Sequence, residues 1–464
     1  MRQFNFKSRI RPALWTATAA FLLATAACTD NDNNNKEEEV IKTFKLNVKL
    51  EYPDGYAPQR DVNVRLRRSN ADDVNEAKTD SAGVAVFTVI AGIYEATAAE
   101  TRSVNGYLSI LNGVKSSIEV TDAYKNGDTI SVSVPLTASK TSQLVIKELY
   151  IGGCENTNSD NSVTNFYQDK YVILYNNSNA PVSLSNLTLA ITVPLLSASK
   201  NEADKIDGKL FYESEGWVPA GYGLWTIQNS PSLDPYKQIV IAINCAVDNT
   251  KTYSQSINFA NPEYYACHDL EVWNDVKNYT VSELIPSEHY LKAYLIGQGS
   301  SWPIGQLSPA FFVFIPEGIT PEAIAAETSY SNYYNNNTQS AAQHRKKIPT
   351  EWVLDAIEVF KSGEQNSNKR LTPAVDAGSV KLTNAKGYTL YRNVDKAATE
   401  AIAENAGKLV YSYSLGTADI ENGSTDPSGI DAEASLKNGA KIIYKDTNNS
   451  TNDFHQRAKA SLRD

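Results

Sequence analysis

The chain of 464 residues has few of the side chains that metal and redox sites require: one methionine, four cysteines and four histidines. The single methionine is Met1, so the mature chain offers no thioether ligand for copper. The histidines His268, His289, His344 and His455 are scattered, and neither an H-E-x-x-H nor a C-x-x-C spacing occurs. We therefore expect no metal centre and no bound cofactor.

Basic residues are also in the minority, with 43 Lys and Arg against 53 Asp and Glu, a net charge of −10 at pH 7. Four of the basic residues lie in an N-terminal segment that we expect to be removed: Arg2, Lys7, Arg9 and Arg11. Without these four, 39 basic residues face 53 acidic ones, so the mature net charge is −14. Because phosphate binding needs a basic face, the composition disfavours a nucleic-acid partner.

Long hydrophobic runs are rare. The apolar run at residues 13–23 is shorter than the roughly 20 residues that span a bilayer, and basic residues precede it while small residues follow. This layout predicts a secretory signal over residues 1–27. The sequence Thr25-Ala26-Ala27-Cys28 resembles a bacterial lipobox, although Thr25 stands where Leu is usual. The resemblance implies that the Cys28 thiol is acylated and becomes the first mature residue; ordinary cleavage with a free thiol is the alternative.

Residues 28–42 are rich in Asn, Asp and Glu and cannot bury a core, so we expect a flexible tether. Acidic residues just after a lipidated cysteine resemble the signal that sends Bacteroidota lipoproteins to the outer face of the outer membrane. A merely solvated linker is the alternative. The expected location is the outer membrane, with a lipid anchor and exposure at the cell surface.

Cysteine use limits the disulfides. Once Cys28 is set aside, Cys154, Cys245 and Cys267 remain, an odd number that allows at most one internal disulfide. Cys245 and Cys267 are the closest pair in the sequence and are the candidate disulfide.

Residues 43–137 alternate apolar and polar side chains, as in Phe44-Lys45-Leu46-Asn47-Val48, which is typical of half-buried strands. A tight turn at Asp80 and Gly83 is followed by a strand and by Gly92-Ile93-Tyr94. This order resembles the small β-sandwich of carboxypeptidase regulatory-like domains. The resemblance implies a non-catalytic spacer. Residues 138–141 break the alternating pattern, so we expect a protease-sensitive joint at residues 137–142.

Residues 143–464 carry further short strand patterns, among them residues 144–151, 171–176, 182–189 and 238–244, separated by polar turns. Such spacing predicts a two-sheet sandwich, and it resembles the immunoglobulin-like lamin tail domain. Later segments strengthen a likeness to uncharacterised Bacteroidota lipoproteins with a domain of unknown function: Trp302-Pro303, residues 308–314, residues 348–356 and residues 446–454. That family implies association with TonB-dependent outer-membrane transporters. The predicted fold class is therefore all-β, two tandem sandwiches with long loops and a few short helices, near Thr320 and after Asp395.

Reaction-defining motifs are weak. Gly297-Gln298-Gly299-Ser300-Ser301 is not a nucleophile elbow, and Cys267-His268-Asp269 places neighbouring side chains on opposite faces of a strand. Residues 155–160 and 426–431 could supply oxygen ligands to calcium, but plain polar turns are the favoured interpretation. We expect no enzymatic activity.

Aromatic residues are plentiful, with 26 Tyr and 6 Trp. Trp217 and Trp225 are assigned to the core rather than to recognition. Residues 329–343 show no periodicity and predict a long exposed loop, in which Tyr330, Tyr333 and Tyr334 are the candidate ligand-binding residues.

Three functional hypotheses follow. The first is a non-catalytic accessory or ligand-capture subunit beside a TonB-dependent transporter. The second is a structural or adhesive surface protein, and the third is a hydrolase that assembles its site from dispersed carboxylates.

Overall fold

Alternating burial builds the first β-sandwich, as the sequence predicts. In the computed structural model, β1 (Phe44–Glu51) buries every second side chain: Phe44, Leu46, Val48 and Leu50. The structure describes residues 41–69, 74–104, 107–140, 142–244, 246–272, 281–298, 304–305, 307–334, 340–418 and 424–463. The other strands of the sandwich, within those residues, are β2 (Asn63–Arg68), β3 (Val74–Lys78), β4 (Val84–Val89), β5 (Gly92–Val104), β6 (Tyr107–Val120), β7 (Thr129–Pro135) and β8 (Thr137–Lys140).

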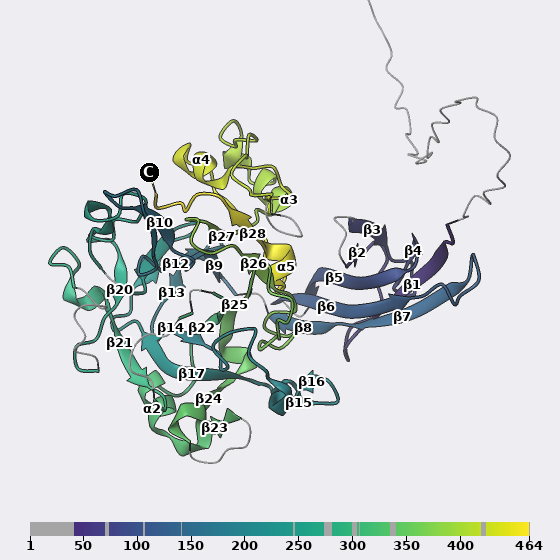
Figure 1. Ribbon diagram of the computed structural model, residues 1–464, viewed down its shortest axis with the longest axis horizontal. Helices are drawn as coiled ribbons and strands as arrows, with labels where there is room; N and C mark the ends of the chain where they lie inside the picture. Colours follow the sequence, from purple (N-terminus) through teal and green to yellow (C-terminus); the bar gives the residue numbers. More distant parts are fainter. Residues whose placement is uncertain are drawn as a thin grey trace, which may run out of the picture. The chain divides into compact units, whose positions relative to one another are not determined.

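These strands form two sheets, in the orders β4-β1-β7 and β3-β2-β5-β6-β8 (Figure 1). β1 pairs antiparallel with β4 and parallel with β7. The apolar side chains of both sheets meet in one core that includes Phe44, Leu66, Phe87, Tyr94 and Leu111. Burying a core on one face of each sheet leaves the other face of the five-stranded sheet for polar side chains.

The larger β region is one long, curled sheet. Its strand order is β26-β25-β22-β14-β17-β21-β20-β19-β12-β9-β27-β28, and β24 joins β17 and carries β23 at its edge. The strands are β9 (Leu144–Tyr150), β12 (Tyr171–Asn176), β14 (Thr188–Ile191), β17 (Trp217–Thr226), β19 (Gln238–Ala242), β20 (Tyr265–Cys267), β21 (Tyr290–Leu295), β22 (Ala310–Phe314), β23 (Ser331–Tyr333), β24 (His344–Pro349), β25 (Val353–Lys361), β26 (Val380–Leu382), β27 (Thr389–Arg392) and β28 (Phe454–Arg457).

Several of these strands are buried along their whole length. Every residue of β9, β12 and β22 is buried, because one side of the sheet faces the main core and the other is covered by smaller clusters and loops. The main core includes Leu144, Val172, Trp225, Phe311 and Ile357. Trp217 and Trp225 are both buried, which agrees with their assignment to core packing.

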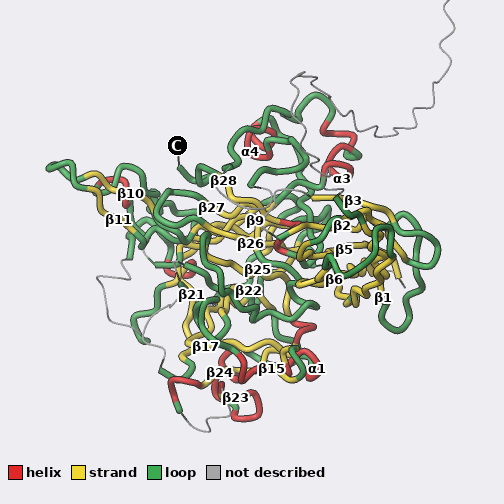
Figure 2. The backbone as a smooth tube through the Cα atoms, turned by 45° about the vertical axis from the view of Figure 1, so that its right-hand side comes forward, coloured by secondary structure: helices red, strands yellow, loops and turns green. Residues whose placement is uncertain are grey.

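Helices are short and lie outside the sheets (Figure 2). Thr320 caps α2 (Pro321–Ala326) and Asp395 caps α3 (Lys396–Glu400), as the sequence indicates. The remaining helices and short strands, within the described residues, are α1 (Phe211–Glu215), α4 (Ala432–Lys437), α5 (Ser450–Asp453), β10 (Cys154–Thr157), β11 (Val163–Phe166), β13 (Val182–Ser183), β15 (Lys205–Ile206), β16 (Lys209–Leu210) and β18 (Ser232–Leu233). In the part of the chain that the structure describes, no helix has the length and hydropathy needed to cross a membrane.

The structure differs from the sequence-based expectation at the joint between the two β regions. Residues Thr137–Lys140 form β8 and pair with β6 at the edge of the five-stranded sheet. Moreover, residues Lys42–Asp464 form one compact unit. Backbone hydrogen bonds between β8 and β6 therefore order most of the segment that we expected to be a protease-sensitive joint.

Candidate functional site

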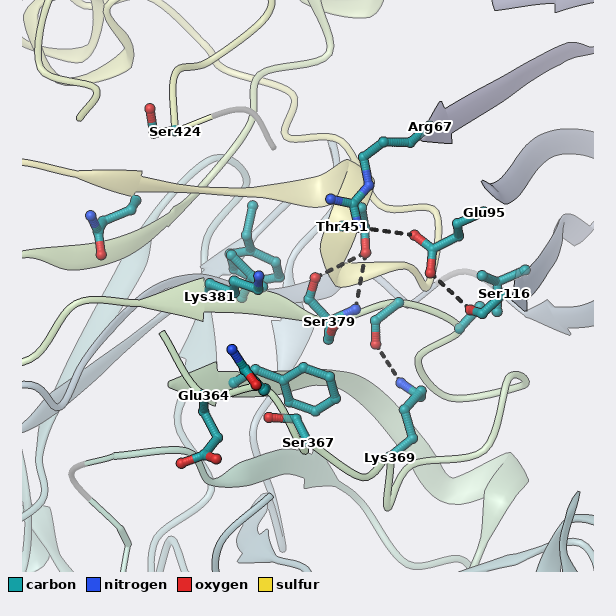
Figure 3. Close-up of a pocket in the computed structure, with 18 residues that line it drawn as sticks. Arg67, Glu95, Ser116, Glu364, Ser367, Lys369, Ser379, Lys381, Ser424 and Thr451 are labelled. Carbon is teal, nitrogen blue, oxygen red and sulfur yellow. Dashed lines mark hydrogen bonds and ion pairs between the residues drawn. The ribbon is translucent and has the colours of Figure 1, made fainter. Parts of the chain in front are cut away.

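A groove of about 320 Å3 lies between the polar face of the first sandwich and the larger region. One wall comes from β2, β5 and β6; the other comes from β25, β26, α5 and β28 (Figure 3). Ligand pockets of proteins start at about 300 Å3 and often occur where two structural units meet. The groove is therefore the candidate ligand site.

Strand register places the charged side chains of the first wall. Arg67 on β2 pairs with Glu95 on β5, and the Arg67 Nη2 atom lies 3.8 Å from the Glu95 Oε1 atom. Ser116 on β6 donates a hydrogen bond of 2.8 Å to Glu95 Oε2. Figure 3 shows these three side chains in a row. The alternation that buries Leu66, Ala96 and Ala98 in the sandwich core turns Arg67 and Glu95 toward the groove.

The second wall is held by α5 and the loop before β26. The Thr451 hydroxyl donates to the Ser379 carbonyl at 2.9 Å and accepts from the Ser379 backbone at 3.0 Å. Lys369 Nζ donates to the Gly378 carbonyl and lies 3.8 Å from Glu358 Oε2. The floor includes the half-buried ring of Phe360.

Gly378 permits the close approach of these two segments. A Cβ at this position would lie 1.9 Å from Asn449 Oδ1 and 2.7 Å from the Thr451 backbone nitrogen. Asn449 is the N-cap of α5 and accepts a hydrogen bond from Thr451. A side chain at residue 378 would therefore displace the helix cap that positions Thr451.

Buried charges support the second wall from behind. Arg392 is fully buried and forms an ion pair with Asp355, while its Nη1 atom lies 3.6 Å from Asp446 and 3.8 Å from Asp453. Burial raises the pKa of Asp355 and of Asp446, and it raises the pKa of Asp453 to about 6. One guanidinium thus faces three carboxyl groups in the buried interior.

A second buried carboxyl fixes the loop that contains Gly378. Asp376 accepts hydrogen bonds from the backbone of Gly378, Glu358 and Ser450. Burial raises the pKa of Asp376 to about 6. These bonds join β25, the loop before β26 and α5 into one support.

A smaller cavity of about 90 Å3 continues the groove and shares Arg67, Glu95, Thr451 and Phe454 with it. At its edge the Arg65 Nη1 atom donates to Asn452 Oδ1 at 3.3 Å. Asn448 also donates to the Ser139 hydroxyl of β8. The segment that contains α5 therefore contacts the first sandwich at two places.

The tyrosines predicted to bind a ligand lie elsewhere. They are half-buried rather than exposed: Tyr330 packs near Trp352, Tyr333 stacks on His344 and the Tyr334 hydroxyl donates to the Lys200 carbonyl. Residues 331–333 pair with β24, so the expectation of a long exposed loop is wrong for this part. Residues 335–339 lie outside the described residues.

Only one of the cysteines predicted as sites, Cys267, lies among the described residues. Cys28 and Cys245 are not among the described residues. Cys267 is a buried free thiol, as is Cys154, whose pKa burial raises to about 12. A raised pKa keeps a thiol protonated and a poor nucleophile.

The two candidate calcium segments form capped turns. The Asp160 carboxylate accepts hydrogen bonds from the backbone and hydroxyl of Ser162, and Asp426 accepts from the backbone of Val394 and Ser428. Within the described residues, no three His, Cys, Asp or Glu side chains gather as a metal site would require. The segment 446–450, interpreted from sequence as a structural cap, does cap α5 through Asn449.

Sequence reasoning missed the groove because its residues lie between positions 67 and 456 and meet only through tertiary structure. The available signal was local: charged residues, Arg67 and Glu95, on the polar sides of predicted strands.

Comparisons with known proteins find a family match in the C-terminal part of the chain. Residues 234–461 match the family described as "Protein of unknown function (DUF4876)". A DUF4876 family protein from Bacteroides thetaiotaomicron VPI-5482 is 19% identical over 89% of this chain and 94% of its own, with a TM-score of 0.49. A DUF3823 family protein from Parabacteroides merdae ATCC 43184 is 12% identical over 33% of this chain and 67% of its own, with a TM-score of 0.15. No curated protein matches the chain. The likeness to the DUF4876 family therefore covers residues 234–461, just under half of the chain.

Proposed function

We propose that this chain is a non-catalytic lipoprotein of the outer-membrane surface that captures a ligand beside a TonB-dependent transporter. The groove between the two β regions is the observation that carries the capture role. An adhesive or purely structural protein needs no such groove, so this feature favours capture over adhesion.

We also propose that each β region resembles a known domain type. The first sandwich acts as a spacer of the carboxypeptidase regulatory-like kind, and the larger region is a lamin-tail-like domain. The turn at Gly83, with a positive φ of 77°, followed by β4 and β5 supports the first likeness. The short strands and polar turns between β9 and β19 support the second.

Membrane attachment depends on Cys28 in this proposal. We expect Cys28→Ala to abolish incorporation of labelled palmitate and to release the protein from the membrane fraction, because the lipobox offers one thiol for acylation. Fractionation and labelling of wild type and variant test this expectation. Palmitate incorporated into the Cys28→Ala protein would rule out the anchor.

We also propose that the chain has no enzymatic activity. The groove is lined by the carboxylates Glu95 and Glu364, and Glu95 accepts a hydrogen bond from Ser116 and lies beside Arg67, which supports a binding role for it. The clustered carboxyls Asp355, Asp446 and Asp453 instead surround Arg392 in the interior.

Co-purification is the decisive experiment. The protein is extracted in mild detergent from its native membranes, after crosslinking, and its partners are identified by mass spectrometry. Recovery of a TonB-dependent receptor in wild type but not in Cys28→Ala supports the proposal. If no β-barrel protein is enriched, the transporter association is wrong.

A further inference from the structure

Arg67 and Glu95 are the charged pair on the first wall of the groove. The Arg67 guanidinium lies 3.8 Å from Glu95, beyond hydrogen-bonding distance, and among the described residues no hydrogen bond holds it. The side chains of Arg67 and Glu95 are 24% and 27% exposed, so both are accessible yet held by the sheet. A strong donor and a strong acceptor therefore stand side by side at the groove wall.

Charged side chains of both signs line the groove: Arg67, Lys369 and Lys381 are basic, and Glu95 and Glu364 are acidic. On the first wall the two signs stand side by side, in Arg67 and Glu95. An ion of either sign at this pair would gain from one partner what it loses to the other. This part of the groove thus lacks the excess charge that selects an anion or a cation.

Hydroxyl groups fit this arrangement, because a hydroxyl can donate to a carboxylate and accept from a guanidinium at once. Bonds to charged partners are also stronger than neutral ones. Phe360, Val114 and Val380 supply apolar lining for carbon-bound hydrogens, while Ser116 and Ser379 offer further hydroxyls.

We propose that the groove binds a neutral, polyhydroxylated ligand of the sugar class, with adjacent hydroxyls bridging Arg67 and Glu95. The proposal rests on the capture function above and names its ligand class. Arg67 donates to one ligand oxygen, and Glu95 accepts from the neighbouring hydroxyl while keeping its bond from Ser116.

The test uses the full-length protein in detergent on an array of neutral and uronate-containing oligosaccharides, followed by titration of the strongest neutral oligosaccharide. We expect Arg67→Gln and Glu95→Gln each to weaken binding tenfold or more, since each removes a charged hydrogen-bonding partner. Arg60→Gln, on the exposed surface of the first sandwich, and Glu404→Gln, in an exposed ion pair with Lys441, are matched controls that should bind as wild type does. Melting temperatures of all four variants show that each is folded.

Three results would overturn the ligand class: no binding on the array, binding confined to the uronate-containing oligosaccharides, or neutral binding unchanged in both groove variants. Failure of the co-purification with a β-barrel leaves this readout unaffected, so the two proposals fail separately. Tenfold losses in Arg67→Gln and Glu95→Gln, with both controls intact, support the assignment.

Discussion

Asp446 carries the excess charge behind the groove. Its Oδ1 atom is buried without a hydrogen-bond partner among the described residues and lies 3.6 Å from an Arg392 that already pairs with Asp355. Burial raises the pKa of Asp446 because the ionised form loses its hydration. The third carboxylate thus opposes folding when it is ionised.

We expect Asp446→Asn to raise the free energy of unfolding by about 1 kcal/mol at pH 8, since it removes this charge at nearly constant shape. At pH 5, where the carboxyl is largely protonated, the gain should vanish. Arg392→Met should instead lower the free energy of unfolding by about 3–5 kcal/mol, because it leaves buried carboxylates unpaired. Urea denaturation at the two pH values measures all three proteins, and a less stable Asp446→Asn protein at pH 8 would contradict the assignment.

At the scale of elements, α5 and the loop before β26 depend on each other. Gly378→Ala would place a methyl group 1.9 Å from Asn449 Oδ1 and 2.6 Å from the Thr451 hydroxyl. We expect a loss of about 1–3 kcal/mol, as for other overpacked positions. Gly305→Ala is the control, because its nearest neighbour would be 3.5 Å away. Equal stabilities of the two variants, by chemical denaturation, would show that the loop can move freely.

The strands differ in how well the sequence predicted them. β1 and β2 are predicted because alternation marks a strand with one buried face, and β9 and β12 because short strand patterns are separated by polar turns. β22 is not predicted as a strand, since residues 308–314 serve only the family resemblance. β23 was missed because its short stretch of tyrosine and polar residues gains order only by pairing with β24. The groove could not be predicted, because no local pattern encodes which polar strand face another region will cover.

The three tyrosines in and beside β23 predict a stability effect. Replacing Tyr330, Tyr333 and Tyr334 with Ser should lower the melting temperature, because it removes packing on Trp352, stacking on His344 and a hydrogen bond to Lys200. Tyr411→Ser is a control, since Tyr411 is 54% exposed. If the triple variant is as stable as wild type, these tyrosines contribute nothing to packing, and the expectation of an exposed loop is correct.

For the whole molecule, buried carboxyls set the pH dependence of stability. Burial raises the pKa of Asp169, Asp376 and Asp453 to about 6 each, whereas an unfolded Asp titrates near about 3.9. Between these values the folded protein binds more protons, so the free energy of unfolding falls as pH rises through the window. His455 acts oppositely, since burial lowers its pKa to about 3 and stability is lost as pH falls below about 6.5.

The carboxyls outnumber this histidine, because Asp355 and Asp446 shift in the same direction as the other three. The net expectation is a higher melting temperature at pH 5 than at pH 8, on the order of 2 °C or more. Thermal scans in buffers of matched ionic strength measure the difference. If the melting temperature falls steadily as the pH is lowered from 8 to 5, these carboxyls ionise without cost in the folded protein.

Protease resistance tests how the first sandwich is connected to the larger region. β8 carries Lys140 within a strand paired to β6, and Ser139 of this strand also accepts a hydrogen bond from Asn448. A protease needs extended, unpaired backbone, so trypsin should cut after Lys140 only when the ladder opens. Limited digestion followed by mass spectrometry should therefore leave a fragment that spans both β regions, and Asn448→Ala should speed cleavage at Lys140 because it removes the contact to Ser139. An early fragment ending at Lys140 in the wild-type digest would instead mean that the two regions are joined by an open linker, as the sequence alone suggested.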